Sequence, residues 1–258
     1  MEADLRFENL SFGYSSITVL KNITLSLPKN AFTAFIGPNG SGKTTLLKTA
    51  SGLLTPSSGS VTLSEGHSPH RMKAKHRAQR IGYLPQSEES FPGFTVSDVI
   101  LSGRYCRTGS FGQYSQADKR LCREKAEIAG IIHLLDKDYS CLSAGEKQLV
   151  RFVRVLCQEA ETLLLDEASA NLDMRHEHQI YSLCRDFVTS GGTVAAALHD
   201  LQYAYQYAHY MLLFFPDKTV LFDIPERIIT KENLEKAFQV KVEIEFLNNR
   251  GVLINTSL

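Results

Sequence analysis

Residues 37–44, GPNGSGKT, constrain the fold more than any other part of the chain. They follow a short apolar run, AFTAFI (31–36), and precede a helical pattern, TTLLKTASGLL (44–54). A glycine-rich loop between a strand and a helix is typical of phosphate binding, because backbone N–H groups and the helix dipole can both face the anion. Lys43 would supply a positive charge there, and the Thr44 hydroxyl can bind Mg²⁺. The alternative, a simple turn with an exposed lysine, is disfavoured by this strand–loop–helix context.

The composition favours one large soluble domain, or a domain with a lobe inserted in it. The 258 residues are 43% apolar and carry a formal net charge of zero, which argues against a broad nucleic-acid interface. The start, MEADLRFENL, does not resemble a signal peptide, and the apolar run MLLFF (211–215) is too short to span a bilayer. The five cysteines, Cys106, Cys122, Cys141, Cys157 and Cys184, include no CxxC pair. We therefore expect a reduced, cytosolic setting, with most of these thiols buried as small apolar groups.

Short apolar runs predict where the strands lie. Apolar and polar residues alternate over the first thirty positions, which predicts an antiparallel sheet with one solvated face. Further short apolar strands are expected within 81–86, 162–167, 193–200 and 211–215, with helical patterns between the later ones. Strand–helix alternation of this kind predicts a parallel sheet with helices on both faces.

Residues 87–160 differ from this core, since they are rich in helical patterns and lack a clear strand. We interpret them as a mainly helical subdomain inserted into an α/β core formed by residues 1–86 and 161–215. The C-terminal extension, 216–258, is expected to hold one helix, KENLEKAFQV (231–240), followed by KVEIEF, which alternates like an edge strand.

TLLLDE (162–167) predicts a buried strand with two carboxylates at its tip. In α/β folds, the carboxyl ends of the strands line the crevice that binds ligands. Asp166 would hold Mg²⁺ directly or through water, and Glu167 would polarise an attacking water as general base. Many strands end in acids, so this pattern gains its weight from the glycine-rich loop.

LSAGEKQLVRFVRVL (142–156) predicts a helix with a defined start. Ser143 and Glu146 form a capping box. One face of the helix is apolar, with Leu149, Phe152, Val153 and Leu156. The simplest interpretation is a well-capped amphipathic helix. Its serine- and glycine-containing N-terminus is also suited to an anion.

LSAGE resembles the LSGGQ signature of ATP-binding cassette (ABC) ATPases. The order of motifs is also similar to that family: a phosphate loop, a glutamine in YLPQ (83–86), the signature, the acidic strand and a histidine in ALHD (197–200). The resemblance covers roughly residues 5–215. It implies an α/β fold: a single ABC ATPase domain with a RecA-like P-loop NTPase core, an N-terminal antiparallel β subdomain and an inserted helical subdomain.

The resemblance also implies roles for single residues. Tyr14 in SFGY would stack on adenine, and Gln86 would sense Mg²⁺ and the nucleophilic water. Asp173 in SANLD would belong to the loop that crosses a dimer interface, and His199 would contact the γ-phosphate. The implied catalytic residues are Glu167, His199 and Gln86, and the implied Mg²⁺ ligands are Thr44, Gln86 and Asp166. The implied ATP-binding residues are Tyr14, Gly37, Pro38, Asn39, Gly40, Ser41, Gly42, Lys43, Thr44, Thr45, Ser143 and Gly145.

Taken singly, Tyr14, Gln86 and His199 are better explained as a surface turn residue, a strand-end cap and a packed core histidine. Their joint occurrence in this order favours the functional interpretation. Two positions depart from the family signature. Ala144 replaces its first glycine, so the backbone there must avoid positive φ. Glu146 replaces its glutamine and preserves the capping box, and we expect activity to survive both changes.

In this family the signature of one subunit completes the phosphate site of another, and this chain carries one copy of each motif. The resemblance therefore implies a head-to-tail dimer of two copies with two ATP molecules between them. Ser143 and Gly145 would then act on the γ-phosphate bound by the partner. ATP binding would close the dimer, and hydrolysis would release it.

Residues 91–121 resemble the helical subdomain of ABC importers for iron-siderophores, haem, vitamin B12 and related metal chelates, most clearly in TVSDVILSGRY (95–105). The tail resembles the end of the same group. This predicts an ATPase that uses ATP and Mg²⁺ and docks on membrane-spanning permease subunits at the cytoplasmic face of the inner membrane. A substrate-binding protein would be an indirect partner, and no nucleic acid is expected. Phe91, Phe94 and Val96 either line a groove for a permease helix or pack within the subdomain, and both remain open.

The main alternative is a soluble, non-transport ABC ATPase of the iron–sulfur assembly type, which is similar in size. The translation and DNA-repair types usually carry tandem cassettes, coiled coils or zinc insertions, which this sequence does not predict. P-loop kinases and small GTPases fail on the signature helix and on His199. His67, His70 and His76 fit no standard metal-ligand spacing and lie among basic residues, so we expect a solvated loop there.

Overall fold

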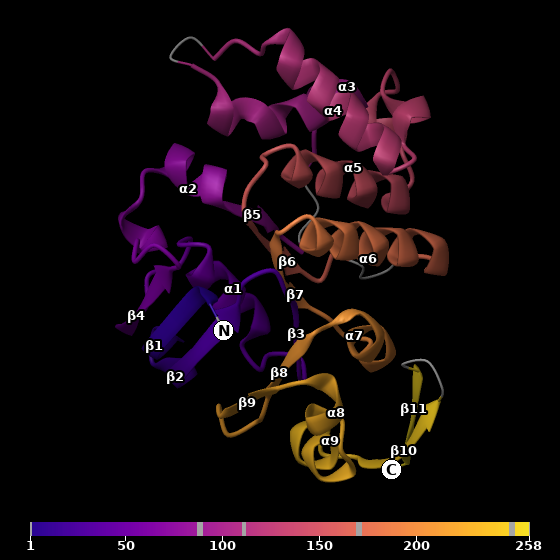
Figure 1. Ribbon diagram of the computed structural model, residues 1–258. Coiled ribbons are helices and arrows are strands. Elements are labelled where there is room, and N and C mark those ends of the chain that lie inside the picture. Colours follow the sequence, from indigo (N-terminus) through magenta and orange to yellow (C-terminus); the bar gives the residue numbers. More distant parts are fainter. Residues whose placement is uncertain (1, 87–89, 110–111, 169–171, 248–250, 258) are drawn as a thin grey trace.

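The computed structural model describes residues 2–86, 90–109, 112–168, 172–247 and 251–257. At its centre lies a six-stranded sheet with the strand order β5-β6-β7-β3-β8-β9 (Figure 1). Neighbouring strands are parallel, except that β9 runs antiparallel to β8. The strands are β3 (Phe32–Ile36), β5 (Ile81–Leu84), β6 (Thr162–Asp166), β7 (Thr193–Ala197), β8 (Tyr210–Phe214) and β9 (Val220–Asp223). The predicted parallel sheet is confirmed, and β9 is an edge strand that the sequence did not indicate.

The sheet separates two apolar cores, because successive side chains of a strand point to opposite faces. Leu164 and Ala195 belong to the core shared with α1 (Lys43–Ala50). Leu163 and Leu165 belong to the other core, shared with α5 (Ala144–Leu156), α6 (Met174–Thr189) and α7 (Leu201–Tyr207). Burial on both faces explains why β3, β6 and β7 are continuous apolar runs.

A second sheet near the N-terminus is antiparallel, as the alternation predicts. Its strand order is β2-β1-β4, with β1 (Ala3–Tyr14), β2 (Ile17–Pro28) and β4 (Ser58–Leu63). Phe7 on the central strand pairs with Leu25 on one side and Val61 on the other. One face of this sheet packs on α1 and the central sheet. The carboxyl end of β1 thereby places Tyr14 beside the loop before α1.

The helices between β5 and β6 lie at one end of the molecule, where α3 and α4 cover α5 (Figure 1). They are α3 (Val96–Ser102), the 3₁₀ turn η2 (Gly103–Arg107), α4 (Gln116–Ile128), the short 3₁₀ turns η3 (Ile132–Leu134) and η4 (Tyr139–Cys141), and α5. The short helix α2 (Ala74–Arg80) precedes β5, after the 3₁₀ turn η1 (Pro69–Arg71). Every named element in the described part of this segment is a helix or a 3₁₀ turn, as predicted, while its status as a separate subdomain stays a prediction.

The C-terminal extension begins with β9 and lies on the opposite side, next to α7 (Figure 1). It contains α8 (Pro225–Ile228), α9 (Lys231–Phe238), β10 (Lys241–Leu247) and β11 (Gly251–Ser257). The predicted helix is α9 and the predicted strand is β10, whereas the expectation of a single helix is wrong because α8 precedes α9. The strand pairs antiparallel with β11 in a separate two-stranded sheet, and Phe246 packs on Tyr205 of α7 with ring centroids 5.7 Å apart.

Two expectations about the chain as a whole can be compared with the described residues. None of the helices in these residues is both long and apolar enough to cross a membrane. The cysteines are free; Cys106, Cys122, Cys157 and Cys184 are buried, and Cys141 is exposed. The expectation that most thiols serve as small buried groups is therefore confirmed.

Candidate functional site

The glycine-rich loop sets Lys43 at the start of α1. Gly42, the residue before the helix, has a φ of +111°, in the region that a side chain would disfavour. Lys43 is buried, and its Nζ donates hydrogen bonds to the carbonyl oxygens of Gly37 (2.7 Å) and Pro38 (3.1 Å). Burial lowers the pKa of Lys43, while nearby carboxylates act in the opposite direction. The ammonium group is thus positioned by its own loop.

Asp166 ends β6 and is almost completely buried beside the loop, with 1% of its surface exposed. Its Oδ1 accepts a hydrogen bond from Thr44 Oγ1 at 2.7 Å, and its Oδ2 accepts one from the Tyr83 hydroxyl at 3.2 Å. Burial raises the pKa of Asp166, and the two hydrogen bonds oppose that effect. The structure therefore joins two of the predicted Mg²⁺ ligands, Thr44 and Asp166, directly.

Glu167 brings the three predicted catalytic residues together. His199 Nε2 lies 2.7 Å from Glu167 Oε1. Gln86 Nε2 donates a hydrogen bond to Glu167 Oε2 at 2.5 Å. Glu167 itself has a φ of +52°, a costly conformation for a non-glycine residue that is typical of functional sites. Both carboxylate oxygens are therefore held, one by a loop after β5 and the other by a loop after β7.

These groups surround a pocket of about 440 Å³. The residues lining it are Tyr14, Val19, Asn39, Gly40, Ser41, Gly42, Lys43, Thr44, Thr45, Gln86, Glu167 and His199. The Ser41 hydroxyl is buried, and among the described residues its oxygen has no hydrogen-bond partner. Tyr14 stands half exposed at the rim, with its ring 4.9 Å from that of Phe12. A phosphate-bearing ligand would find donors on the floor and an aromatic ring at the edge.

Five predicted site residues do not line this pocket. Gly37 and Pro38 contribute the carbonyl groups that hold Lys43, and Asp166 lies behind Thr44. Ser143 and Gly145 are at the start of α5, outside the pocket-lining set. Within one chain, the signature residues therefore do not line the pocket that the phosphate loop forms.

The signature helix begins as the sequence predicts. The Ser143 hydroxyl accepts a hydrogen bond from the Glu146 N–H at 3.3 Å, and the Glu146 carboxylate accepts one from the Ser143 N–H at 2.9 Å. Ala144, which replaces the first glycine of the family signature, is the first residue of α5 and does not have a positive φ. The capping box and the backbone expectation at Ala144 are both confirmed.

Gly145 lies against His176, three residues after Asp173 of the predicted interface loop. A Cβ on Gly145 would stand 2.7 Å from His176 Nδ1, so only glycine fits without displacing the ring. The same Nδ1 lies 2.8 Å from Asp173 Oδ1, and the Asp173 carboxylate caps α6 by accepting the His176 N–H at 2.9 Å. These hydrogen bonds hold the pKa of Asp173 below its ordinary value. Residues 169–171 of the SANLD segment lie outside the described residues.

A groove of about 330 Å³ runs beside the signature helix. It is lined by Ser90, Phe91, Pro92, Tyr139, Ser140, Ala144, Lys147, Gln148 and Arg151. The rings of Phe91 and Tyr139 meet edge to face at 5.2 Å. Of the three residues proposed for such a groove, Phe91 lines it, Phe94 is 52% exposed, and Val96 is part of the core. Phe91 therefore fits the first alternative, a residue that lines a groove, and Val96 fits the second, a residue that packs inside the protein.

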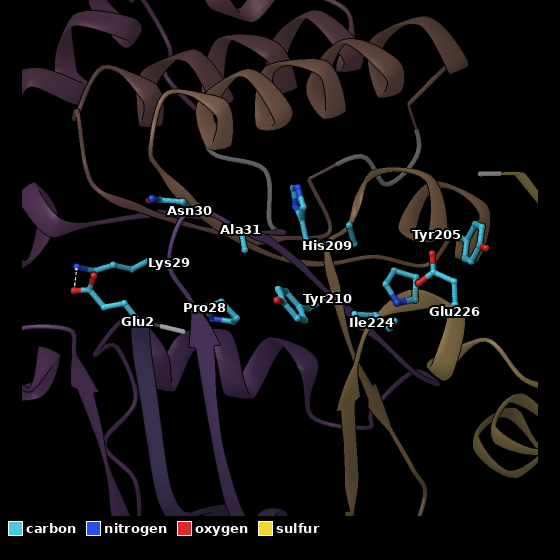
Figure 2. A pocket seen from close by; sticks show the side chains of 12 residues that line it. Glu2, Pro28, Lys29, Asn30, Ala31, Tyr205, His209, Tyr210, Ile224 and Glu226 are labelled. Carbon is cyan, nitrogen blue, oxygen red and sulfur yellow. Dashed lines mark hydrogen bonds and ion pairs between the residues drawn. The ribbon is translucent and has the colours of Figure 1, made fainter. Parts of the chain in front are cut away.

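Another pocket, of about 550 Å³, lies at the amino ends of β3 and β8 (Figure 2). Ala31, His209 and Tyr210 are part of its lining, and Lys29 and Glu2 pair at 2.7 Å at one side. His209 Nδ1 accepts the N–H of Phe32 at 3.1 Å, which fixes the ring to the sheet. Ligands of open α/β sheets bind at the carboxyl ends of the strands. We therefore place the functional site at the pocket of about 440 Å³, which lies at the carboxyl ends of the strands and is lined by Lys43 and Glu167.

The three histidines of the segment 65–76 have different surroundings. His67 is exposed beside Glu65, with 3.5 Å between Nδ1 and Oε2, whereas His70 Nε2 lies 2.9 Å from the Leu54 carbonyl oxygen. Within the part of the chain that is described, no group of three His, Cys, Asp or Glu residues could hold a metal ion. The solvated loop expected here is right for His67 and wrong for the other two histidines, because His70 is tied to the backbone and His76 lies in α2.

Tyr83 and Val19 belong to the site but were not predicted. The pairing of β5 with β6, with Tyr83 opposite Leu164, brings the phenol to Asp166. Burial raises the pKa of Tyr83, so the phenol stays protonated and donates. IGYL shows an aromatic residue at a strand end, but its partner depends on strand order, which the local sequence does not specify.

The fold agrees with comparisons to known proteins. The ABC transporter family matches residues 20–170. The ferric enterobactin transport ATP-binding protein FepC of Escherichia coli K12 is 37% identical over 94% of this chain and 89% of its own length. The hemin import ATP-binding protein HmuV of Gloeobacter violaceus is also 37% identical, over 85% of this chain and 82% of its own. A solved structure, an inward-facing metal-chelate type ABC transporter, covers 99% of this chain and 97% of that chain, with a TM-score of 0.84 and 24% identity, which shows the fold.

The phosphate loop, the start of the signature helix and the acidic end of β6 all lie within the residues that the family matches. The chain belongs to the ABC transporter family, as one of its ATP-binding proteins that hydrolyse ATP.

Proposed function

We propose that this chain is the ATP-hydrolysing subunit of an importer for an iron siderophore, haem or another metal chelate. The hydrolytic part rests on one observation, the Glu167 carboxylate held by Gln86 and His199 at the wall of the Lys43 pocket. The transport part is supported by the names of the relatives, which are transport or import ATP-binding proteins for ferric enterobactin and hemin.

The pocket would bind ATP through its phosphates. Lys43 and the N-terminus of α1 offer positive charge to the β- and γ-phosphates, and the Ser41 hydroxyl offers a donor whose oxygen lacks another partner among the described residues. The phosphates would also offset the burial that lowers the pKa of Lys43. Tyr14 at the rim would stack on the adenine ring.

Thr44, Asp166 and Gln86 would hold the Mg²⁺ that accompanies ATP. Their hydroxyl, carboxylate and amide groups offer the oxygen donors that Mg²⁺ prefers, and the Thr44–Asp166 hydrogen bond places two of them together. A bound Mg²⁺ would neutralise part of the phosphate charge.

Glu167 would act as the general base. A water oxygen bonds to the γ-phosphorus, the water proton passes to the Glu167 carboxylate, and the bond to the β–γ bridging oxygen breaks with its electron pair leaving on ADP. Gln86 and His199 keep both carboxylate oxygens in place for this transfer. The strained backbone at Glu167 fits a carboxylate that is positioned in advance.

Two copies of the chain would complete the site. Ser143 and Gly145 do not line the pocket of their own chain, yet the start of α5 has the free N–H groups that suit a phosphate. In a head-to-tail dimer, each signature would reach the γ-phosphate bound by the other copy. Asp173, which is linked through His176 to Gly145, would lie at the same interface.

Glu167→Gln tests this proposal. The amide keeps the shape of the carboxylate but cannot accept the water proton, so hydrolysis should fall by about 10²–10⁴-fold while ATP still binds. With Mg²⁺ and ATP the variant should accumulate as a dimer. Phosphate release and light scattering after size exclusion measure the two effects.

Lys43→Ala is the matched control, because it removes the phosphate-binding charge and leaves Glu167 intact. It should bind ATP weakly and form no ATP-dependent dimer. Hydrolysis by the Glu167→Gln protein at the parent rate would show that Glu167 is not the base. Unchanged ATP affinity of the Lys43→Ala protein would remove the phosphate-loop assignment.

The groove beside α5 is the place where a membrane-spanning permease subunit would dock. It combines aromatic residues with Lys147 and Arg151, which suits an amphipathic helix. The chain would then work at the cytoplasmic face of the inner membrane, with a substrate-binding protein as an indirect partner. The alternative, a soluble ATPase of the iron–sulfur assembly type, finds no support in the relatives reported above.

A further inference from the structure

Two polar side chains of α5 are buried where the helix passes over the sheet. Arg151 is 2% exposed, and Gln148, one turn before it, is 9% exposed. Arg151 Nη1 donates to Gln148 Oε1 at 2.7 Å. A buried arginine is costly unless its donors are satisfied, so these contacts are a specific arrangement rather than a default of packing.

The pair connects two segments that are distant in sequence. Gln148 Nε2 donates to the carbonyl oxygen of Ala168 at 2.7 Å, and Arg151 Nη2 donates to that of Pro85 at 2.6 Å. The two residues therefore form a continuous bridge from the loop after β6 to the loop after β5. We call this the α5 bridge.

Each end of the α5 bridge is next to a residue of the hydrolytic site. Ala168 follows Glu167, and Pro85 precedes Gln86 in the chain. Gln86 Nε2 in turn donates to the Glu167 carboxylate. The bridge and this hydrogen bond close a ring, so a shift of either loop relative to α5 changes the position of Gln86 against Glu167.

We propose that Gln148 and Arg151 are positioning residues for hydrolysis, which hold the Gln86 amide on the Glu167 carboxylate. This rests on the proposed role of Glu167 as the base. Neither residue lines the nucleotide pocket, so their contribution is expected in the chemical step and not in ATP binding. Both line the groove beside α5, where a bound segment would contact the bridge itself.

Arg151→Met tests the proposal, since it keeps a long, unbranched side chain and removes the Nη1 and Nη2 donors that bind Gln148 and Pro85. We expect kcat for ATP hydrolysis by the full chain to fall by about 10- to 100-fold, because small misplacements of catalytic groups have effects of this size. KM for ATP should stay within about twofold of the parent value. Gln148→Met removes the contact to Ala168 and should act in the same direction, and it serves if Arg151→Met does not fold.

A double-mutant cycle with Gln86→Ala separates positioning from general damage. If the bridge acts through Gln86, the protein with both changes should lose no more activity than the slower single variant. A loss equal to the product of the two single losses would overturn the proposal, as would a parent-like kcat in both bridge variants.

Arg154→Met is the matched control on the same helix. The Arg154 guanidinium lies over the Phe91 ring, 5.3 Å from its centroid, and this change should leave kcat within about twofold of the parent. Glu167→Gln, measured in parallel, distinguishes the two levels of failure. If hydrolysis survives Glu167→Gln, the proposed function fails; if hydrolysis needs Glu167 but the cycle is multiplicative, only the bridge fails.

Discussion

At the scale of single residues, Asp4 shows how a buried acid can oppose stability away from any ligand. Asp4 on β1 is 4% exposed and accepts a hydrogen bond from the Thr162 hydroxyl at the start of β6. Burial raises the pKa of Asp4, and hydrogen bonds from Thr162 and Thr193 only partly compensate. The folded state therefore binds the Asp4 proton more tightly than the unfolded chain does.

Asp4→Asn should therefore stabilise the protein at neutral pH. With a raised folded-state pKa, ionised Asp4 destabilises the fold above that pKa, and protonation removes this effect as the pH falls through it. The neutral amide should raise the melting temperature at pH 7.5 by about 2–4 °C, the change expected for roughly 1 kcal/mol in a chain of this size. The gain should shrink on going to about pH 4, near the ordinary pKa of a carboxyl group, and ATP hydrolysis should not change. Scanning calorimetry at the two pH values checks this; a variant that melts below the parent at pH 7.5 contradicts it.

The sequence predicts a functional residue best where a motif fixes its neighbours. Lys43, Thr44 and Asp166 follow from local patterns, and the structure brings them together. Tyr83 and Gln148 escape prediction because their partners, Asp166 and Ala168, lie on other elements. The capping role of Ser143 is local and was predictable, whereas its separation from the pocket needed the fold.

At the scale of elements, Arg104 joins the turn η2 to α4 and to the end of α5. Its Nε lies 2.7 Å from Asp118 Oδ1, and its Nη1 donates to the Cys157 carbonyl oxygen at 2.8 Å and to Glu159 Oε2 at 2.7 Å. Asp118 also forms the capping box of α4 with Ser115. The hydrogen bond from Ser115 and the Arg104 guanidinium lower the pKa of Asp118 to about 2. The Asp118 carboxylate therefore caps α4 and also binds Arg104, which joins α4 to η2 and to the end of α5.

Asp118→Asn should weaken the fold in a pH-dependent way. A folded-state pKa near 2, below the ordinary value near 4, means that Asp118 contributes stability above pH 4 that is lost as the pH falls toward 2. The difference in unfolding free energy from the parent should be on the order of 2 kcal/mol at pH 6 and smaller at pH 3.5. Urea unfolding at both pH values measures it.

Asp98→Asn is the control for capping alone. Asp98 forms the equivalent capping box of α3 with Thr95, and its removal should cost about 1 kcal/mol. If Asp118→Asn costs no more than Asp98→Asn at pH 6, the contact with Arg104 adds nothing to the cap.

At the scale of the whole molecule, the apolar runs were enough to predict the strands but not their order. β3, β6 and β7 are recognisable because both faces of each are buried. The position of β3 between β7 and β8 depends on crossovers of many residues. Such long-range pairings have no counterpart in local periodicity.

The surface beside α5 has an exposed aromatic residue next to a groove. The groove opens next to Phe94, whose side chain is 52% exposed and whose backbone pairs with Tyr139 at the groove wall. Ile128, at the end of α4, is exposed to 64%; neither it nor Phe94 lines the groove itself, but Phe94 is bonded to the groove wall through Tyr139. An exposed aromatic residue beside a partly apolar groove is typical of a docking site.

The proposed importer role therefore predicts recovery of the native chain from membranes. After gentle detergent extraction, the chain should be isolated with a protein that spans the membrane several times, because none of its own described helices can do so. Phe94→Ser should lower this recovery several-fold by removing an aromatic contact, while Ile128→Ser should leave it unchanged and both should hydrolyse ATP. Quantitative mass spectrometry of the isolated complexes measures the effect. Recovery only from the cytosol with soluble companions would leave the ATPase chemistry in place and remove the importer, and equal recovery of both variants would move the docking site away from this groove.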